Sequence, residues 1–123
     1  MTKVRILAAA LLLLLNVPLN AANESLWNET LERISSGVVS IRVDATRAFD
    51  TEWNTSSQAT GFVVDAKRGI LLTNRHVVTT GPVIAEAIFQ NNEEVQLTPI
   101  YRDPVHDFGF YRYDPAELKY IEP

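Results

Sequence analysis

Residues 59–73 read ATGFVVDAKRGILLT and contain two runs of apolar residues separated by a polar turn. The runs at 59–64 and 69–73 have the length and composition of β-strands, and Gly69 stands where a turn often requires a positive φ. The stretch therefore predicts a β-hairpin. His76 follows directly after it. Because a rigid scaffold commonly presents functional side chains at strand ends, this histidine is the first candidate functional residue.

Strand-like patterns continue on both sides of the hairpin. Upstream, Val39, Ile41 and Val43 alternate with polar residues, which predicts a strand with one buried face. Downstream, similar runs occupy residues 83–89, 95–101 and 108–113. Turn signals recur about every ten residues, a spacing typical of all-β domains. The sequence therefore predicts an all-β fold of six short strands, either a small antiparallel barrel or a sandwich.

Two segments outside the strands have different patterns. Residues 24–34 predict a short helix because their large apolar residues share one face: Trp27, Leu31 and Ile34. The sequence Ser35-Ser36-Gly37 is expected to end this helix. Residues 47–58 are mostly polar and predict a surface loop. The large apolar side chains of that loop belong to Phe49 and Trp53.

The N-terminus has the three parts of a secretory signal peptide. Lys3 and Arg5 precede an apolar run at residues 6–15, and small residues follow it. The run is too short for a stable membrane anchor, because a helix needs roughly 20 apolar residues to cross a bilayer. We expect cleavage after Ala21 or Ala22. Residues 1–22 are thus predicted to be a signal peptide, residues 23–123 the folded domain, and the protein to be exported, either to the periplasm or outside the cell.

Composition excludes several classes of function. The chain has 123 residues and no cysteine, which rules out disulfides, thiolate zinc sites and a cysteine nucleophile. Its 15 acidic and 11 basic residues give a net charge of −4, so a nucleic-acid partner is not expected. No HExxH or comparable ligand spacing occurs, so neither a metal nor another cofactor is predicted.

His76 and His106 are the only histidines, and they differ in their surroundings. His106 adjoins Asp107, but neighbouring side chains on an extended segment point to opposite faces and do not meet. A pairing of Asp107 with His76 is therefore the geometry of greater interest, and if Asp107 faces inward, His106 faces water. In nucleophilic hydrolysis an imidazole takes the proton of a serine hydroxyl, while a carboxylate on its other nitrogen fixes the tautomer.

Three segments resemble motifs of the HtrA (Deg) family of trypsin-like serine proteases. Residues 73–78 (TNRHVV) resemble the catalytic-histidine motif, residues 57–64 (SQATGFVV) the strand before it, and residues 103–110 (DPVHDFGF) the catalytic-aspartate segment. The sequence of residues 61–78 is most similar to the branch of large HtrA-like proteins with tandem protease and PDZ units. The resemblance implies a fold of two six-stranded barrels, of which residues 23–123 would form the first. It also implies that His76 is the general base and Asp107 its orienting partner.

The family's nucleophile motif, Gly-x-Ser-Gly-Gly, does not occur in the sequence. The chain is therefore expected to be an N-terminal protease fragment that is inactive alone and that lacks the C-terminal half of its protease domain. Protein or peptide substrates, among them exported or misfolded proteins, are implied by the resemblance. One alternative is a secreted, non-catalytic barrel that binds partners through its exposed wall and the loop with Phe49 and Trp53. Another is a split enzyme completed by a second chain.

Overall fold

The computed structural model describes residues 19–45, 56–79 and 81–123, with side chains described from residue 23 onward. Phe49 and Trp53 lie outside the described residues, as does most of the predicted signal peptide. The chain divides into two compact units, Met1–Leu31 and Glu32–Pro123. The second unit contains all the strands and both candidate catalytic residues.

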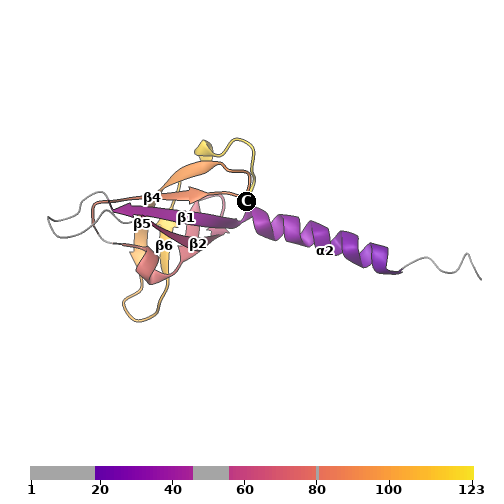
Figure 1. Ribbon diagram of the computed structural model, residues 1–123, viewed down its shortest axis with the longest axis horizontal. Coiled ribbons are helices and arrows are strands. Elements are labelled where there is room, and N and C mark those ends of the chain that lie inside the picture. The colour runs from indigo at the N-terminus through magenta and orange to yellow at the C-terminus, as the bar shows by residue number, and fades with distance from the viewer. Residues whose placement is uncertain (1–18, 46–55, 80) are drawn as a thin grey trace, which may run out of the picture. The chain divides into compact units, whose positions relative to one another are not determined.

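Helix α2 (Leu19–Ser36) precedes the strands (Figure 1). It confirms the predicted short helix but begins five residues before the expected start at residue 24, because Ala21 and Ala22 are strong helix formers. It ends where expected: the N–H of Gly37 donates to the carbonyl of Ile34 (3.1 Å). Four large apolar residues on the helix are exposed, including the three predicted to share one face: Leu26, Trp27, Leu31 and Ile34. Among the described residues, no helix is long and apolar enough to cross a membrane.

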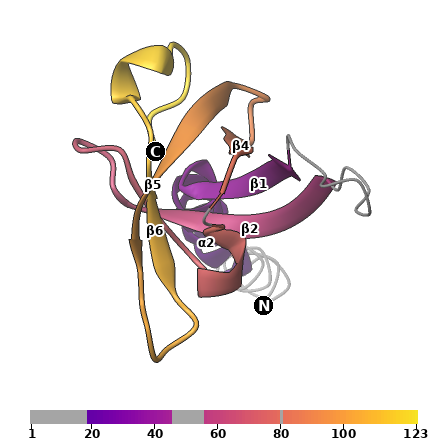
Figure 2. The ribbon, with the colours of Figure 1, turned by 90° about the vertical axis from the view of Figure 1, so that its left-hand side faces the viewer.

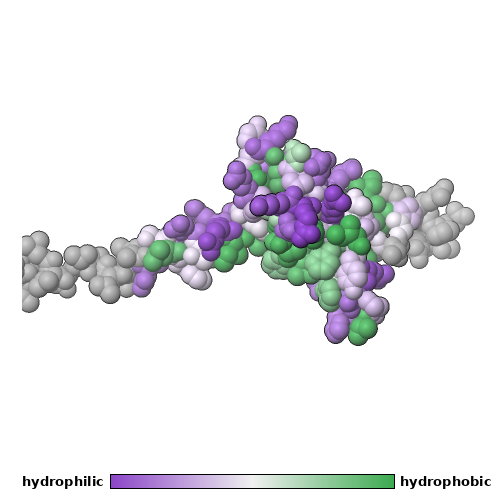
Figure 3. All heavy atoms as spheres, turned by 180° about the vertical axis from the view of Figure 1, so that it is seen from behind, coloured by the Kyte–Doolittle hydropathy of each residue, from purple (hydrophilic) through white to green (hydrophobic). Residues whose placement is uncertain are grey.

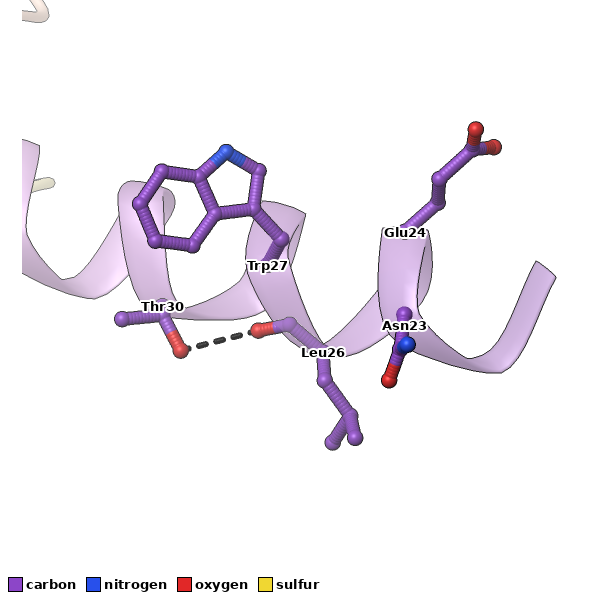
Figure 4. Close-up of a pocket in the computed structure, with 5 residues that line it drawn as sticks. All are labelled: Asn23, Glu24, Leu26, Trp27 and Thr30. Atoms are coloured by element: carbon purple, nitrogen blue, oxygen red, sulfur yellow. Dashed lines mark hydrogen bonds between the residues drawn. The ribbon is translucent and has the colours of Figure 1, made fainter. Parts of the chain in front are cut away.

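The side chains of Leu26 and Trp27 leave α2 on different sides (Figure 4). With Asn23, Glu24 and Thr30 they line an open pocket. The hydroxyl of Thr30 donates to the carbonyl of Leu26 (2.8 Å), so it is already used within the helix. Ligand sites usually combine enclosure with converging polar groups, and the described residues of this pocket, all from one helix, provide neither.

Six antiparallel strands form a closed barrel in the order β1-β2-β3-β6-β5-β4 (Figures 1 and 2). The barrel confirms the predicted fold class. A short 3₁₀ helix, η1 (Arg75–Val77), follows β3, and a second, η2 (Pro115–Glu117), follows β6. The strands are β1 (Val38–Ala45), β2 (Ser56–Asp65), β3 (Ile70–Thr73), β4 (Val83–Ile88), β5 (Glu94–Arg102) and β6 (Gly109–Arg112).

The barrel interior is filled by the alternating residues that the sequence pattern predicts. On β1, Val39, Ile41 and Val43 are all buried. Tyr111 on β6 is completely buried, and its hydroxyl donates to the carbonyl of Val77 (2.9 Å). This bond joins the barrel core to the turn that follows β3. The rest of the buried apolar core consists of Leu71, Val77, Val78, Ala85, Ala87, Phe89, Val95, Leu97 and Tyr113.

Strand β2 begins earlier than the sequence predicts. Residues 56–58 were expected to lie in the polar loop, yet Ser56, Ser57 and Gln58 pair with residues 42–44 of β1. The partner strand supplies the backbone hydrogen bonds, which outweighs the weak strand preference of these polar residues. Polarity alone therefore does not identify the start of β2.

A carboxylate holds the C-terminal residues against the β4–β5 turn. Glu93 accepts hydrogen bonds from the backbone N–H groups of Lys119 (2.7 Å), Tyr120 (3.2 Å) and Ile121 (3.0 Å). The side chain of Asn91 also donates to it, and these bonds together keep the pKa of Glu93 below its ordinary value despite partial desolvation. The last residues of the chain are therefore fixed to the barrel by an anion.

Gly69 in the β2–β3 turn provides a test of the hairpin. Its φ is +65°, and an added Cβ would collide with the carbonyl of Tyr113, whose N–H donates to the Gly69 carbonyl (2.8 Å). We expect Gly69→Ala to lower the free energy of unfolding by about 3 kcal/mol, through left-handed strain and overpacking. Gly37→Ala is the matched control, because its Cβ would only touch Ile34 O at 3.6 Å and Val63 Cβ at 3.9 Å. Equal denaturation midpoints for the two variants would contradict this account of the turn.

Candidate active site

The pairing of β3 with β6 determines where the two predicted site residues lie. Thr73, the last residue of β3, is opposite Gly109, the first residue of β6. His76 comes shortly after Thr73, within η1, and Asp107 comes shortly before Gly109. Since antiparallel strands place the end of one beside the start of the other, both residues emerge at the same end of this strand pair.

His76 and Asp107 are in direct contact. The imidazole Nδ1 lies 2.9 Å from Oδ2 and 3.1 Å from Oδ1 of Asp107, and the backbone N–H of His76 donates to Oδ1 (3.2 Å). An ionised carboxylate only accepts hydrogen bonds, so in this arrangement Nδ1 carries the proton and the neutral ring keeps its lone pair on Nε2. The structure thus brings together the pair that the sequence predicts.

Both side chains are open to solvent. The side chain of His76 is 72% exposed and that of Asp107 is 46% exposed. Among the described residues, no hydrogen bond to Nε2 of His76 is found. The ring can therefore accept a proton on Nε2 from a group outside the described barrel. The orienting carboxylate is half-exposed here, whereas orienting carboxylates in hydrolase triads are buried.

Asp107 remains a carboxylate because of its hydrogen bonds. Desolvation pushes its pKa upward, but hydrogen bonds from the backbone N–H of His76, from the imidazole and from the amide of Asn74 outweigh this effect. The net pKa of Asp107 is below its ordinary value. The negative charge that orients His76 is therefore stabilised by its immediate neighbours.

Two residues beside His76, which the sequence pattern did not indicate as site residues, also contact the aspartate loop. Nδ2 of Asn74 donates to Oδ2 of Asp107 (3.2 Å), and Nη1 of Arg75 donates to the carbonyl of Pro104 (3.1 Å). The only signal in the sequence was the presence of two polar side chains directly before the histidine. Their partners lie about thirty residues away in the chain, and nothing in the residue types specified them.

His106 has a separate partner. Its Nδ1 lies 3.2 Å from Oδ1 of Asp103, and its side chain is 74% exposed, so it contacts water and not Asp107, as predicted. Asp103 also accepts the backbone N–H groups of Val105 (2.9 Å) and His106 (2.6 Å) and the hydroxyl of Tyr101 (2.9 Å). Bonds from His106 and its neighbours lower the pKa of Asp103 to about 2, although desolvation opposes them. Asp103 therefore braces the loop that carries Asp107.

An outward-facing apolar row runs across five strands next to this site. The register places Val38, Phe62, Leu72, Phe110 and Tyr101 side by side, on β1, β2, β3, β6 and β5 in turn. Phe62 is 51% exposed and Tyr101 is 45% exposed. The rings of Tyr101 and Phe110 lie 6.0 Å apart, and Phe108, beside Asp107, contacts both. Apolar residues are also seen on the barrel surface in Figure 3.

No group of three or more metal-ligating side chains occurs in the part of the chain that the structure describes. The two histidines each contact a single carboxylate, which is a hydrogen-bonded pair and not a ligand set. The chemistry available at the site is therefore that of an exposed imidazole oriented by a carboxylate.

The titration of Asp107 tests this geometry. In His76→Ala the imidazole donor is lost, so we expect the pKa of Asp107 to rise toward its ordinary value near 3.8. Because the folded pKa is depressed, the stabilisation from this pair is complete above the unfolded pKa and is lost as the pH falls through the folded pKa. Carboxyl ¹³C NMR measures the midpoint. His106→Ala is the control, since it removes a histidine that bonds Asp103, and an equal rise in that variant would contradict the pairing.

Comparison with known proteins identifies the family of this chain. A family model described as a trypsin-like peptidase domain matches residues 59–123, more than half of the chain. The chain is 57% identical over 100 residues to the pro-apoptotic serine protease NMA111 of Kluyveromyces lactis, covering 81% of this chain and 10% of that protein. It is 56% identical over 95 residues to protease Do-like 7 of Arabidopsis thaliana, covering 77% of this chain and 9% of that protein.

A PDZ domain-containing protein of Schizosaccharomyces pombe is 51% identical over 100 residues, again covering 10% of its own length. The chain thus spans about a tenth of the length of the curated relatives it matches. The family resemblance predicted from three sequence motifs is confirmed by these matches. This chain belongs to the family of trypsin-like serine peptidase domains, with HtrA-type Do-like and NMA111 proteases among its relatives.

Proposed function

We propose that this chain supplies the general base and the orienting carboxylate of an HtrA-like serine endopeptidase. The observation that carries the proposal is the hydrogen bond between Nδ1 of His76 and Asp107 (2.9 Å) on a ring whose Nε2 is open to solvent. A general base needs a free lone pair facing the reacting group and a partner that fixes its tautomer. The Asp107 contact supports the second requirement, and the exposure of the ring leaves Nε2 accessible to a reacting group.

The proposed reaction is acyl transfer to a serine. Nε2 of His76 takes the hydroxyl proton as the serine oxygen attacks the peptide carbonyl carbon, and Asp107 stabilises the imidazolium that forms. Collapse of the tetrahedral intermediate breaks the C–N bond, and the imidazolium returns its proton to the leaving amine. Water then repeats the sequence on the acyl-enzyme, which releases the second product and restores the serine.

The nucleophile is proposed to lie outside this sequence. No serine occurs after His76, and none of those before it stands in a Gly-x-Ser-Gly-Gly motif that would provide an oxyanion hole. Removing the nucleophile of subtilisin lowers turnover about 10⁶-fold. We therefore expect the chain to be inactive alone and to act when joined to the remainder of a protease domain.

The apolar row from Val38 to Tyr101 is the surface on which we propose that this remainder packs. It adjoins Asp107 through Phe108, so covering it would also bury the half-exposed carboxylate. Contiguous exposed apolar surface beside a functional site is typical of an interface. Protein or peptide substrates, including exported or misfolded proteins, would then bind between the two parts.

A fusion protein tests the activity. Residues 23–123 are joined to the remaining part of the protease domain of the Kluyveromyces lactis relative, and cleavage of an unfolded protein is measured. We expect cleavage that falls by about 10⁴-fold or more in His76→Ala and in Asp107→Asn, because the base or its correct tautomer is lost. His106→Ala is the matched control and should retain activity.

Activity that survives His76→Ala would remove this residue from the mechanism. A fusion that binds the substrate without cleaving it would favour the second candidate function, a non-catalytic binding barrel. The apolar row is the observation that supports this candidate, since it provides a contact surface whether or not the site is catalytic.

We also propose that the protein is exported, on the pattern of residues 1–22. Expression of the full chain should yield a product outside the cytoplasm whose N-terminal sequence begins at Ala22 or Asn23. Leu13→Asp places a charge within the apolar run and should keep the product in the cytoplasm with its full N-terminus. Recovery of uncleaved wild-type chain in the cytoplasm would disprove export.

A further inference from the structure

We propose that Asn74 and Arg75 are positioning residues that hold the Asp103–Asp107 loop so that the carboxylate of Asp107 stays on Nδ1 of His76. This inference deepens the proposed function and rests on it for its catalytic meaning. With His76, the two residues form three consecutive positions that all bond the same loop. Residues 74–76, at and just before η1, therefore hold the aspartate segment in place through hydrogen bonds.

Asn74 controls the carboxylate itself. Its Nδ2 lies 3.2 Å from Oδ2 of Asp107 and 3.4 Å from the backbone carbonyl of the same residue. His76 contributes its backbone N–H to Oδ1 and its Nδ1 to both oxygens. The carboxylate is thus bonded both by the residue that precedes η1 and by a residue within it. Rotation about its χ angles would break the bond to Asn74 and the bonds to His76 together.

Arg75 controls the loop backbone. Its Nη1 donates to the carbonyls of Pro104 (3.1 Å) and Asp103 (3.5 Å), at the start of the loop that ends in Asp107. The carboxylate of Asp103 is bonded to Tyr101, Val105 and His106, and the guanidinium bonds backbone carbonyls of the loop instead. Arg75 thus attaches the loop to the element that carries the histidine.

Solvent exposure makes this bracing necessary. The side chain of Asp107 is 46% exposed, so water competes for its oxygens, and a single exposed hydrogen bond contributes little to holding one geometry. Several bonds from one rigid turn restrict the loop more than any one of them. The property that these bonds control is the tautomer of His76. It matters because loss of the correct tautomer in a serine protease triad lowers kcat about 10⁴-fold.

The tautomer is measured by ¹⁵N NMR of the imidazole nitrogens in the 123-residue chain, at a pH where the ring is neutral. We expect wild type to show Nδ1 protonated and Nε2 unprotonated. Asn74→Ala and Arg75→Ala should each show a mixture of both tautomers, and Arg75→Lys should recover part of the wild-type signal because an ammonium reaches one carbonyl. Unchanged wild-type ¹⁵N shifts in both alanine variants would overturn the proposal.

Matched controls separate positioning from general loss of stability. Asn91→Ala removes another amide-to-carboxylate bond, to Glu93, and Arg112→Ala removes an exposed arginine of β6. Neither contacts residues 103–107, so both should leave the His76 tautomer as in wild type even where the denaturation midpoint falls. A mixture of tautomers in these controls would also overturn the proposal.

The fusion protein distinguishes this proposal from the proposed function. If it is active, Asn74→Ala and Arg75→Ala should lower kcat about 10-fold with little change in KM, and Arg75→Lys should restore part of the loss. If the wild-type fusion is inactive while the tautomer changes as expected, the positioning holds and the proposed function fails. If the fusion is active and neither variant alters kcat or the tautomer, the positioning fails and the proposed function stands.

Discussion

The antiparallel pairing of β3 with β6 is the constraint on which the site depends. The register of Thr73 opposite Gly109 fixes how far His76 and Asp107 lie beyond the strand ends. A shift of one residue would turn Tyr111 out of the core and move the carboxylate away from the imidazole. The burial of Tyr111 and the bond from its hydroxyl to Val77 stabilise this register. Core packing and the placement of His76 beside Asp107 thus depend on the same four residue pairs.

The site combines a rigid supporting barrel with side chains that are exposed to solvent. The barrel supplies fixed strand ends, and the side chains that meet there are polar and solvated. Orientation is therefore achieved by several weak bonds between η1 and the loop before β6, whereas burial would achieve it in a closed enzyme site. Asp103 contributes from within the loop, and Asn74 and Arg75 contribute from the facing turn. The apolar row beside them lies where further protein would exclude water from these bonds.

Much of the barrel and part of the site could be predicted from the sequence. Alternation at Val39, Ile41 and Val43 identified a buried strand face because the side-chain period of a strand is two. The same rule excluded His106 as the partner of its neighbour Asp107, and the resemblance to the protease motifs assigned Asp107 to His76. The roles of Asn74 and Arg75 could not be read, since their partners are chosen by tertiary register. Periodicity placed Trp27, Leu31 and Ile34 on one face of α2, and the exposure of that face could not be predicted, because periodicity does not say what covers a face.

Closure of the barrel by β1 and β4 has a consequence for how the chain folds. β1 pairs with β2 on one edge and, through residues 40–45, with residues 83–88 of β4 on the other. Contacts between distant segments slow folding, because the entropy of loop closure is lost before the pairing compensates for it. During synthesis, β1 waits for β4 at residues 83–88, and β3 waits for β6 at residues 109–112, which is made after the other five strands. The unpaired edges are open to other chains during this interval, and His76 acquires its carboxylate partner only when the last strand joins.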